Sequence, residues 1–300
     1  MKKIANILKE RLSRVERENN PKISLEGKTF TLQKQKFQNV KPASTFKNII
    51  FIDGGNQDVI TTPGFTLQKI RISKVFYQEE ARKNIENKEY YLLVDDEGKV
   101  VYEQNNKKYE DKYEQEPVNA FRKTKEFEQA TQEKDLVIID GALNNALVKQ
   151  NIFKQATSQK NVVGIAKTTK AQSKNKLPVN YIFKTFTKKH DIKPPYVYEA
   201  FTIKNTKTHF VSMYKNRVLR IDTHKDANIH VILHSLKKHF YDPSFPGYPY
   251  GLIDADDNAR VTNVEINEDK LNLKTVIGNS NYNLLDESFD AHDILDNMKF

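Results

Sequence analysis

Two aspartates of this sequence, Asp53 and Asp140, each follow a short apolar segment and precede a glycine. The segments, Asn48 to Ile52 and Leu136 to Ile139, are rich in β-branched residues, which predicts buried strands that stop at the acids. One Asp-Gly pair alone is ordinary turn chemistry. Two such strands side by side would bring both carboxylates together, which is unfavourable unless a cation neutralises them. The pattern therefore predicts a cation site.

Further acids lie on predicted helices. The segment from Val118 to about Gln132 contains neither glycine nor proline and carries Glu126 and Glu128. The spacing leaves both glutamates open, with Glu126 preferred. A later helix that begins near Gly251 carries three aspartates: Asp254, Asp256 and Asp257.

Helical periodicity separates these three aspartates. Asp256 shares a face with the apolar residues Leu252 and Ala259, whereas Asp254 and Asp257 turn away from it. An acid on an apolar face needs a partner or a function. Asp256 is therefore the predicted site residue of this helix.

The acids follow one another in a particular order: strand with aspartate, extended segments, helix with glutamate, second strand, late helix. This is the order found in an RNase H-like nuclease. Such a site suits magnesium or manganese, which are held by a few carboxylates together with substrate phosphate. Two ions about 4 Å apart can activate the attacking water and stabilise the leaving oxygen of a phosphodiester. The predicted fold class is α/β, an RNase H-like mixed sheet flanked by helices, with insertions and an N-terminal helix.

The remaining elements fit a single domain. Apolar residues at helical spacing predict a helix over 1–20, and no low-complexity linker divides the chain. We expect one domain over 1–300, with the N-terminal helix (1–20), a core with insertions (48–265) and a C-terminal extension (266–300). Further strands are predicted at 65–77, 89–103 (with a turn at 95–98), 162–166, 200–203, 210–214 and 218–221, and further helices at 143–155, 228–241 and 289–298.

Composition limits the partners and the compartment. The formal charge is +10, which attracts a polyanion at long range, although a lysine-rich proteome would give the same surplus. The sequence has no cysteine, which removes disulfides and thiolate metal sites and fits a reducing cytosol. No segment approaches the ~20 apolar residues of a membrane span. We expect a soluble, cytoplasmic protein.

A lysine-rich region follows the strand predicted at 162–166, and Phe183 and Phe186 interrupt it. Basic residues with interleaved aromatics suit single-stranded nucleic acid, because bases stack on the rings and lysines meet the phosphates. In the alternative, the region is a solvated loop whose phenylalanines belong to the core. The candidate nucleic-acid-binding residues are Lys170, Lys174, Lys176, Lys184, Lys188 and Lys189.

Four segments make the sequence resemble the NurA nuclease family. They occur in the family's order and are Phe51–Gly55, Asp135–Leu143, Val163–Lys167 and Pro246–Asp256. The resemblance implies that Asp53, Glu126 and Asp140 are the core metal ligands. It also implies that Tyr248 and Asp256 match the family's late tyrosine and late metal-site residue, and that Lys167 approaches the scissile phosphate or the carboxylates.

The resemblance carries further expectations. It implies a metal-dependent deoxyribonuclease that uses Mn²⁺ or Mg²⁺, with two ions, and resects DNA ends in double-strand break repair. It also implies a homodimer that works with the hexameric ATPase and translocase HerA. The sequence departs from the family at three positions: Gly55 and Ala142 replace the serine usual after each Asp-Gly, and Asp256 replaces a frequent histidine. Aspartate is still a competent ligand for a hard cation, so we expect altered metal preference rather than inactivity.

Two other functions remain open. The departures from the family also fit a catalytically silent DNA-binding or scaffold subunit that kept the fold. The acids alone fit equally an RNase H-like enzyme that cuts RNA or an RNA–DNA hybrid, because recognition of the 2′-hydroxyl is a local contact.

Overall fold

The computed structural model describes residues 4–5, 9–10, 12–13, 18–104, 107–167, 170–173, 176–214, 217–243 and 245–286. Most of the predicted N-terminal helix (1–20) lies outside these residues, as do the predicted helix at 289–298 and Lys174. None of the helices in the described part of the chain is long and apolar enough to cross a membrane.

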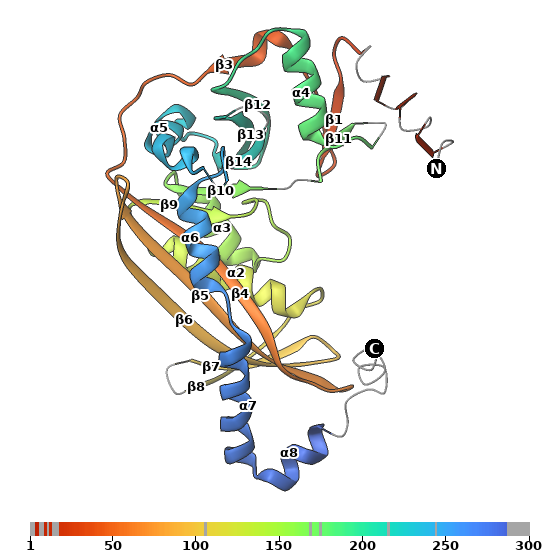
Figure 1. The fold of residues 1–300 in the computed structure, drawn as a ribbon, viewed down its shortest axis with the longest axis vertical. Helices are drawn as coiled ribbons and strands as arrows, with labels where there is room; N and C mark the ends of the chain where they lie inside the picture. The colour runs from red at the N-terminus through yellow and green to blue at the C-terminus, as the bar shows by residue number, and fades with distance from the viewer. Residues whose placement is uncertain are drawn as a thin grey trace.

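A mixed sheet of 11 strands runs through the molecule (Figure 1). Its three central strands, β10, β9 and β4, are parallel to one another, and all other neighbours pair antiparallel. A separate three-stranded sheet is formed by β11 (Gln172–Ser173), β1 (Lys22–Leu25) and β2 (Lys28–Thr31). The strands of the main sheet, in spatial order, are β3 (Phe37–Asn39), β12 (Tyr196–Ile203), β13 (Thr206–Ser212), β14 (Leu219–His224), β10 (Val162–Ala166), β9 (Leu136–Asp140), β4 (Asn48–Thr61), β5 (Phe65–Gln78), β6 (Ala81–Asp95), β7 (Lys99–Gln104) and β8 (Lys107–Lys112).

The central strands are buried on both faces, which explains their continuous apolar sequence. In β4, Ile49 and Phe51 belong to one core cluster, while Ile50 and Ile52 belong to the cluster on the opposite face. Both faces therefore need a covering layer, and helices supply it. The strands predicted at 48–52, 136–139 and 162–166 are confirmed.

Two pairs of helices cover the centre of the sheet. Side chains of α2 and α3 pack into one core cluster, and side chains of α5 and α6 pack into the other. The helix predicted at 143–155 begins only at Gln150, and the one predicted at 228–241 divides into α5 and a 3-10 helix, η2. The helices are α2 (Pro117–Thr131), α3 (Gln150–Ser158), α4 (Val179–Lys189), α5 (Ile229–Ser235), η2 (Lys237–Tyr241), α6 (Tyr250–Ala259), α7 (Asn263–Ile277) and α8 (Asn279–Asp286), with a further 3-10 helix, η1 (Lys34–Lys36), before β3.

The prediction that the first strand stops at Asp53 is wrong, because β4 continues for a further eight residues to Thr61. Gly54 and Gly55 lie inside the strand, where they allow the helices to approach closely. A Cβ on Gly54 would lie 2.8 Å from Glu126 Oε1 of α2, and a Cβ on Gly55 would lie 2.3 Å from the carbonyl oxygen of Ala259 in α6. The glycines are thus explained by packing across the strand rather than by a turn.

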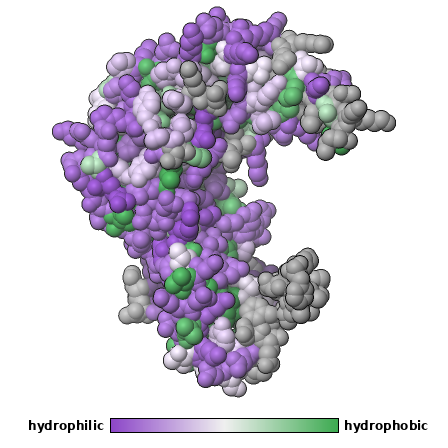
Figure 2. All heavy atoms as spheres, in the orientation of Figure 1, coloured by the Kyte–Doolittle hydropathy of each residue, from purple (hydrophilic) through white to green (hydrophobic). Residues whose placement is uncertain are grey.

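The long strands β4, β5 and β6 extend away from the centre of the sheet towards α7 and α8 (Figure 1). The face of the molecule shown in Figure 2 is largely hydrophilic, with apolar patches over the lower part. Three apolar side chains of α7, Val264, Leu271 and Val276, are exposed. Exposed apolar side chains therefore occur on α7.

Candidate active site

Asp53 and Asp140 lie side by side on the two central parallel strands. In the register of β4 and β9, Ile52 pairs with Ile139, so the two aspartates occupy the next position along each strand. The Asp53 side chain is buried and accepts a hydrogen bond of 2.8 Å from the backbone N–H of Gly54. Asp140 remains partly exposed, with 17% of its side chain accessible.

Glu126, on α2, is fully buried, and its charge interacts with those of Asp53 and Asp140. The space for its carboxylate exists because Gly54 has no side chain. Lys123 Nζ lies 2.6 Å from Glu126 Oε2 and donates to the carbonyl oxygen of Asp140 at 3.0 Å. Glu126 Oε1 has no hydrogen-bond partner among the described residues. Glu128, the alternative on this helix, forms an ion pair with Lys125 instead.

The acids perturb one another. Burial raises the pKa of Asp53 well above its ordinary value, and the neighbouring Glu126 raises it further, while Lys123 acts in the opposite direction. Burial also raises the pKa of Glu126, against the lowering effect of Lys123 and Arg122. The ionised form of each carboxylate is therefore disfavoured, and a bound cation would stabilise the ionised form of both.

The two carboxylate oxygens of Asp140 are held by Tyr248 and Lys167. The Tyr248 hydroxyl donates to Asp140 Oδ1 at 3.0 Å, and Lys167 Nζ lies 2.9 Å from Asp140 Oδ2. The Lys167 ammonium also lies over the Tyr248 ring, 5.0 Å from its centroid. Burial, and then the negative charge of Asp140, raise the pKa of Tyr248, so its hydroxyl stays protonated and acts as a donor.

The periodicity argument for Asp256 is wrong in its assignment of faces. Asp254 is the buried acid of α6, and it accepts hydrogen bonds from the Tyr77 hydroxyl at 2.8 Å and from Arg82 at 2.9 Å. These partners come from the hairpin of β5 and β6, which periodicity within one helix does not reveal. Asp256 is exposed, yet its charge acts on Lys167 and Tyr248, which places it at the rim of the same site.

The predicted nucleic-acid-binding lysines separate into different surroundings. Lys170 lines an open pocket of about 460 Å³. Asp140 and Lys167 line the same pocket, so Lys170 lies near the candidate site. Lys184 and Lys188, on α4, line a different pocket. Lys176 is exposed, and Lys189 donates to Asn19 Oδ1 at 2.8 Å.

Of the two interpretations of this region, burial supports the one in which the phenylalanines belong to the core. Phe183 and Phe186 are buried in a core cluster between α4 and β12, with Tyr198 and Phe210. The alternating lysines and phenylalanines are those of an amphipathic helix, which buries the rings and exposes the charges.

Two residues of the site were missed from the sequence. Lys123 stands three positions before Glu126 on the same face of α2, a spacing that predicts contact once the helix is known. Asp222 of β14 is buried and accepts a hydrogen bond of 3.0 Å from the backbone N–H of Leu143, which fixes the turn after Asp140. No sequence pattern around Asp222 indicates this contact.

The donor set fits a hard divalent cation. In the part of the chain that the structure describes, no three acidic or histidine side chains already converge as a metal-binding group. Lys123 lies against Glu126 and the carbonyl of Asp140, and its ammonium supplies positive charge there. Glu126 Oε1 has no hydrogen-bond partner among the described residues, and the pKa of Asp53 is raised. Both observations indicate a position at which a bound cation would stabilise the carboxylates.

The fold is α/β and of RNase H-like type, and known nucleases have similar folds. The NurA nuclease from Sulfolobus solfataricus has a similar structure, with a TM-score of 0.57 and 13% identity over 89% of this chain and 91% of that chain. A NurA structure with manganese also has a TM-score of 0.57, with 9% identity over 94% of this chain and 99% of that chain. Endonuclease V from Ciona intestinalis, in complex with DNA, is less similar, with a TM-score of 0.43 and 12% identity over 87% of this chain and 97% of that chain.

The sequence itself matches the NurA domain over residues 47–261. The chain therefore belongs to the NurA family. No curated protein matches the sequence.

Proposed function

We propose that this nuclease hydrolyses phosphodiester bonds of DNA with the help of a divalent cation. The observation that carries the proposal is the position of Asp53 and Asp140 next to each other on β4 and β9, with the charge of Glu126, on α2, acting on Asp53. Glu126 adds a buried oxygen without a hydrogen-bond partner among the described residues. Such a buried acceptor is costly unless a ligand satisfies it.

Asp53, Glu126 and Asp140 would hold the cation, with Asp256 as a further ligand at the rim. Bound Mn²⁺ or Mg²⁺, as one ion or two, would lower the pKa of an attacking water and neutralise charge on the phosphate. Tyr248 and Lys167 hold the two oxygens of Asp140 in place. Lys167 would also orient the phosphate, because its side chain is partly exposed and lines the open pocket together with Asp140.

Two observations favour nucleic acid as the substrate. The chain carries a formal charge of +10, and Lys167 and Lys170 line the pocket beside Asp140. Lysine and arginine bind phosphate oxygens through charge-assisted hydrogen bonds. The use of manganese is supported by the similar NurA structure, which is described with that metal.

Family membership supports a wider role. We propose that the protein resects DNA ends in double-strand break repair, as a homodimer with a HerA-like translocase. The exposed apolar side chains of α7 offer a surface for a second copy of the chain. Sedimentation of the purified chain tests the dimer, and co-purification with the translocase from the same organism tests the partner.

Cleavage of end-labelled single-stranded DNA, double-stranded DNA, RNA and RNA–DNA hybrid tests the proposed activity. Each substrate is incubated with Mn²⁺, Mg²⁺ or EDTA. We expect metal-dependent cleavage of DNA that is lost in Asp53→Ala and in Asp140→Asn. Asp58→Asn is the matched control, because Asp58 lies on the same strand, is exposed and contacts Gln68 instead of the site.

Full activity of Asp53→Ala would contradict the proposal. DNA binding without cleavage under any metal would support a silent DNA-binding subunit. Preferential cleavage of RNA or the hybrid would redirect the substrate assignment.

A further inference from the structure

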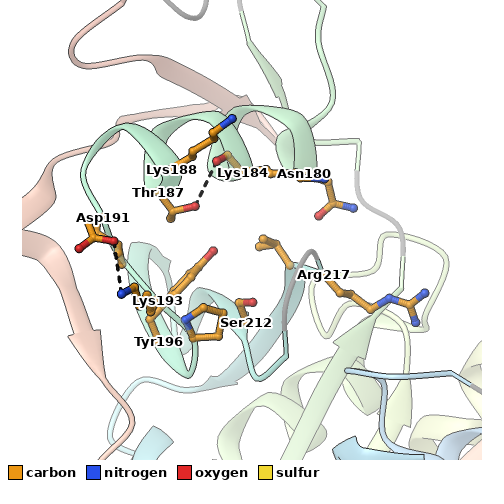
Figure 3. A pocket seen from close by; sticks show the side chains of 12 residues that line it. Asn180, Lys184, Thr187, Lys188, Asp191, Lys193, Tyr196, Ser212 and Arg217 are labelled. Atoms are coloured by element: carbon orange, nitrogen blue, oxygen red, sulfur yellow. Dashed lines mark hydrogen bonds and ion pairs between the residues drawn. The ribbon is translucent and has the colours of Figure 1, made fainter. Parts of the chain in front are cut away.

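A second pocket shares no lining residue with the one beside Asp140. It is formed by α4, the segment that follows this helix, the start of β12 and the segment before β14 (Figure 3). Its volume is about 300 Å³. The side chains in Figure 3 surround a hollow, with Tyr196 in the middle and Arg217 at one side.

Hydroxyl groups are concentrated inside this pocket. Tyr196 is buried near the hydroxyls of Thr187 and Ser212, which donate to the carbonyl oxygens of Lys184 and Tyr214. Burial raises the pKa of Tyr196, so its side chain stays a neutral phenol. Thr187 and Ser212 are buried as well. Three hydroxyls therefore stand close together on one lining.

Cations are concentrated around the hydroxyls. Lys184 and Lys188 extend from successive turns of α4, Lys193 follows the helix, and Arg217 approaches from the segment before β14. Among the described residues that line the pocket, the one carboxylate is that of Asp191. It pairs loosely with Lys193 at 3.7 Å, where both side chains are more than 80% exposed, so the pair is weak.

Arg217 connects this pocket to the carboxylate site. Its guanidinium lies 3.9 Å from the ring centroid of Phe245, and Phe245 meets the ring of Tyr248 edge-on at 5.7 Å. Tyr248 then donates to Asp140. One continuous line of side-chain contacts therefore joins the cationic pocket to the acids.

We propose that this pocket binds a phosphate group of the nucleic-acid strand that is cut at the carboxylate site. Phosphate accepts charge-assisted hydrogen bonds from lysine and arginine, and Lys184, Lys188, Lys193 and Arg217 all line the pocket. The inference rests on the proposed function for the identity of the strand. The phosphate is either a terminal one or one within the strand, since both present the same oxygens.

Binding is measured in EDTA, so that no cleavage occurs and a failure of catalysis does not affect the result. The full chain is titrated with inorganic phosphate by calorimetry. It is also titrated with fluorescent single-stranded oligonucleotides that carry a 5′-phosphate, a 3′-phosphate or hydroxyls at both ends. The variants are Lys184→Gln with Lys188→Gln together, and Arg217→Gln alone. Lys189→Gln is the matched control, because Lys189 follows Lys188 on the same helix, is exposed and lies outside the pocket.

We expect the double variant to weaken binding about tenfold or more and to reduce the slope of the salt dependence by about 0.7 for each phosphate that is no longer neutralised. The control removes one positive charge from the same helix and should change binding much less. Selective loss of the preference for one phosphorylated end would support a terminal phosphate, and equal loss with all three oligonucleotides would support a phosphate within the strand. The proposal would be overturned if Lys176→Gln with Lys189→Gln weakened binding as much as the double variant does. It would also be overturned if binding of inorganic phosphate did not depend on Lys184 and Lys188.

Discussion

Lys123 Nζ lies 2.6 Å from Glu126 Oε2, one turn apart on α2 and inside the candidate metal site. The lysine side chain is only 16% exposed, and the glutamate is fully buried. The pair places a cation of the protein against one of the proposed metal ligands. Lys123 therefore stabilises the carboxylates where they meet, and it also opposes any second positive charge there.

Lys123→Met should strengthen metal binding and weaken the metal-free protein. Breaking a buried ion pair costs about 3 kcal/mol or more, because Glu126 is left without its partner. We expect the melting temperature in EDTA to fall and the rise produced by Mn²⁺ to be larger than in the wild type. Calorimetry with Mn²⁺ should give a lower Kd. Lys125→Met, which breaks the pair with Glu128, is the control and should not change the Kd. A Kd unchanged or raised in Lys123→Met would contradict this role.

Glu126→Gln and Glu128→Gln should separate the two acids of α2. The first change removes a buried carboxylate beside Asp53, so cleavage should fall by about 100-fold or more. The second changes an ion pair away from the site and should leave the cleavage rate within about twofold of the wild type. Single-turnover cleavage of DNA under saturating metal measures both. A larger loss for Glu128→Gln would reassign the site residue.

Gly55→Ala should separate α6 from β4. The added Cβ would lie 2.3 Å from the carbonyl oxygen of Ala259, and backbone cannot yield there without moving the helix. We expect a loss of about 1–3 kcal/mol in the free energy of unfolding and a slower cleavage rate, because α6 carries Asp256. Urea unfolding and cleavage assays measure the two effects. Gly64→Ala, where no atom lies within 4 Å of the new Cβ, is the control. Equal stability of the two variants would disprove the packing argument.

His209 should make the protein less stable at acid pH. Burial, followed by the charges of Lys207 and His230, lowers its pKa to about 3 from 6.5. Between these values the unfolded chain binds a proton that the folded chain does not, so the free energy of unfolding falls as the pH drops below about 6.5. The slope for one proton is at most about 1.4 kcal/mol per pH unit. His209→Gln removes this contribution, so urea unfolding at pH 7 and pH 5 should show a smaller drop for the variant. The same drop in both proteins would exclude His209 as the cause.

The sequence was sufficient to predict that Asp53 and Asp140 lie next to each other. The apolar segments before Asp53 and Asp140 predicted two buried strands, and the parallel register of β4 and β9 brings the two acids together as expected. Gly54 and Gly55 were expected to end the strand after Asp53, but they lie inside it and allow α2 and α6 to pack closely. The sequence alone does not distinguish a glycine that ends a strand from one that allows close packing inside it.

The helical acids show where periodicity fails. An acid is buried at position 254 because Tyr77 and Arg82 come from another hairpin to satisfy it. The burial pattern of one helix depends on what packs against it, and the sequence of that helix does not contain this information. The helices α4 and α7 were not predicted at all. In α4 the sequence left open whether the phenylalanines bind bases or belong to the core, and their packing in the structure supports the core.

The wide separation of the site residues along the chain has a consequence for how the protein is made. Asp53, Glu126 and Asp140 leave the ribosome early, but Tyr248 and Asp256 come more than 100 residues after Asp140. The edge strand β3 (Phe37–Asn39) can pair only after its partner β12 (Tyr196–Ile203) has been synthesised. Contacts this distant in sequence form late in folding, because closing a long loop costs entropy before the contact contributes any stabilisation. A chain released before residue 248 therefore carries the central acids but lacks the tyrosine that holds Asp140, so synthesis itself delays the appearance of a complete cutting centre.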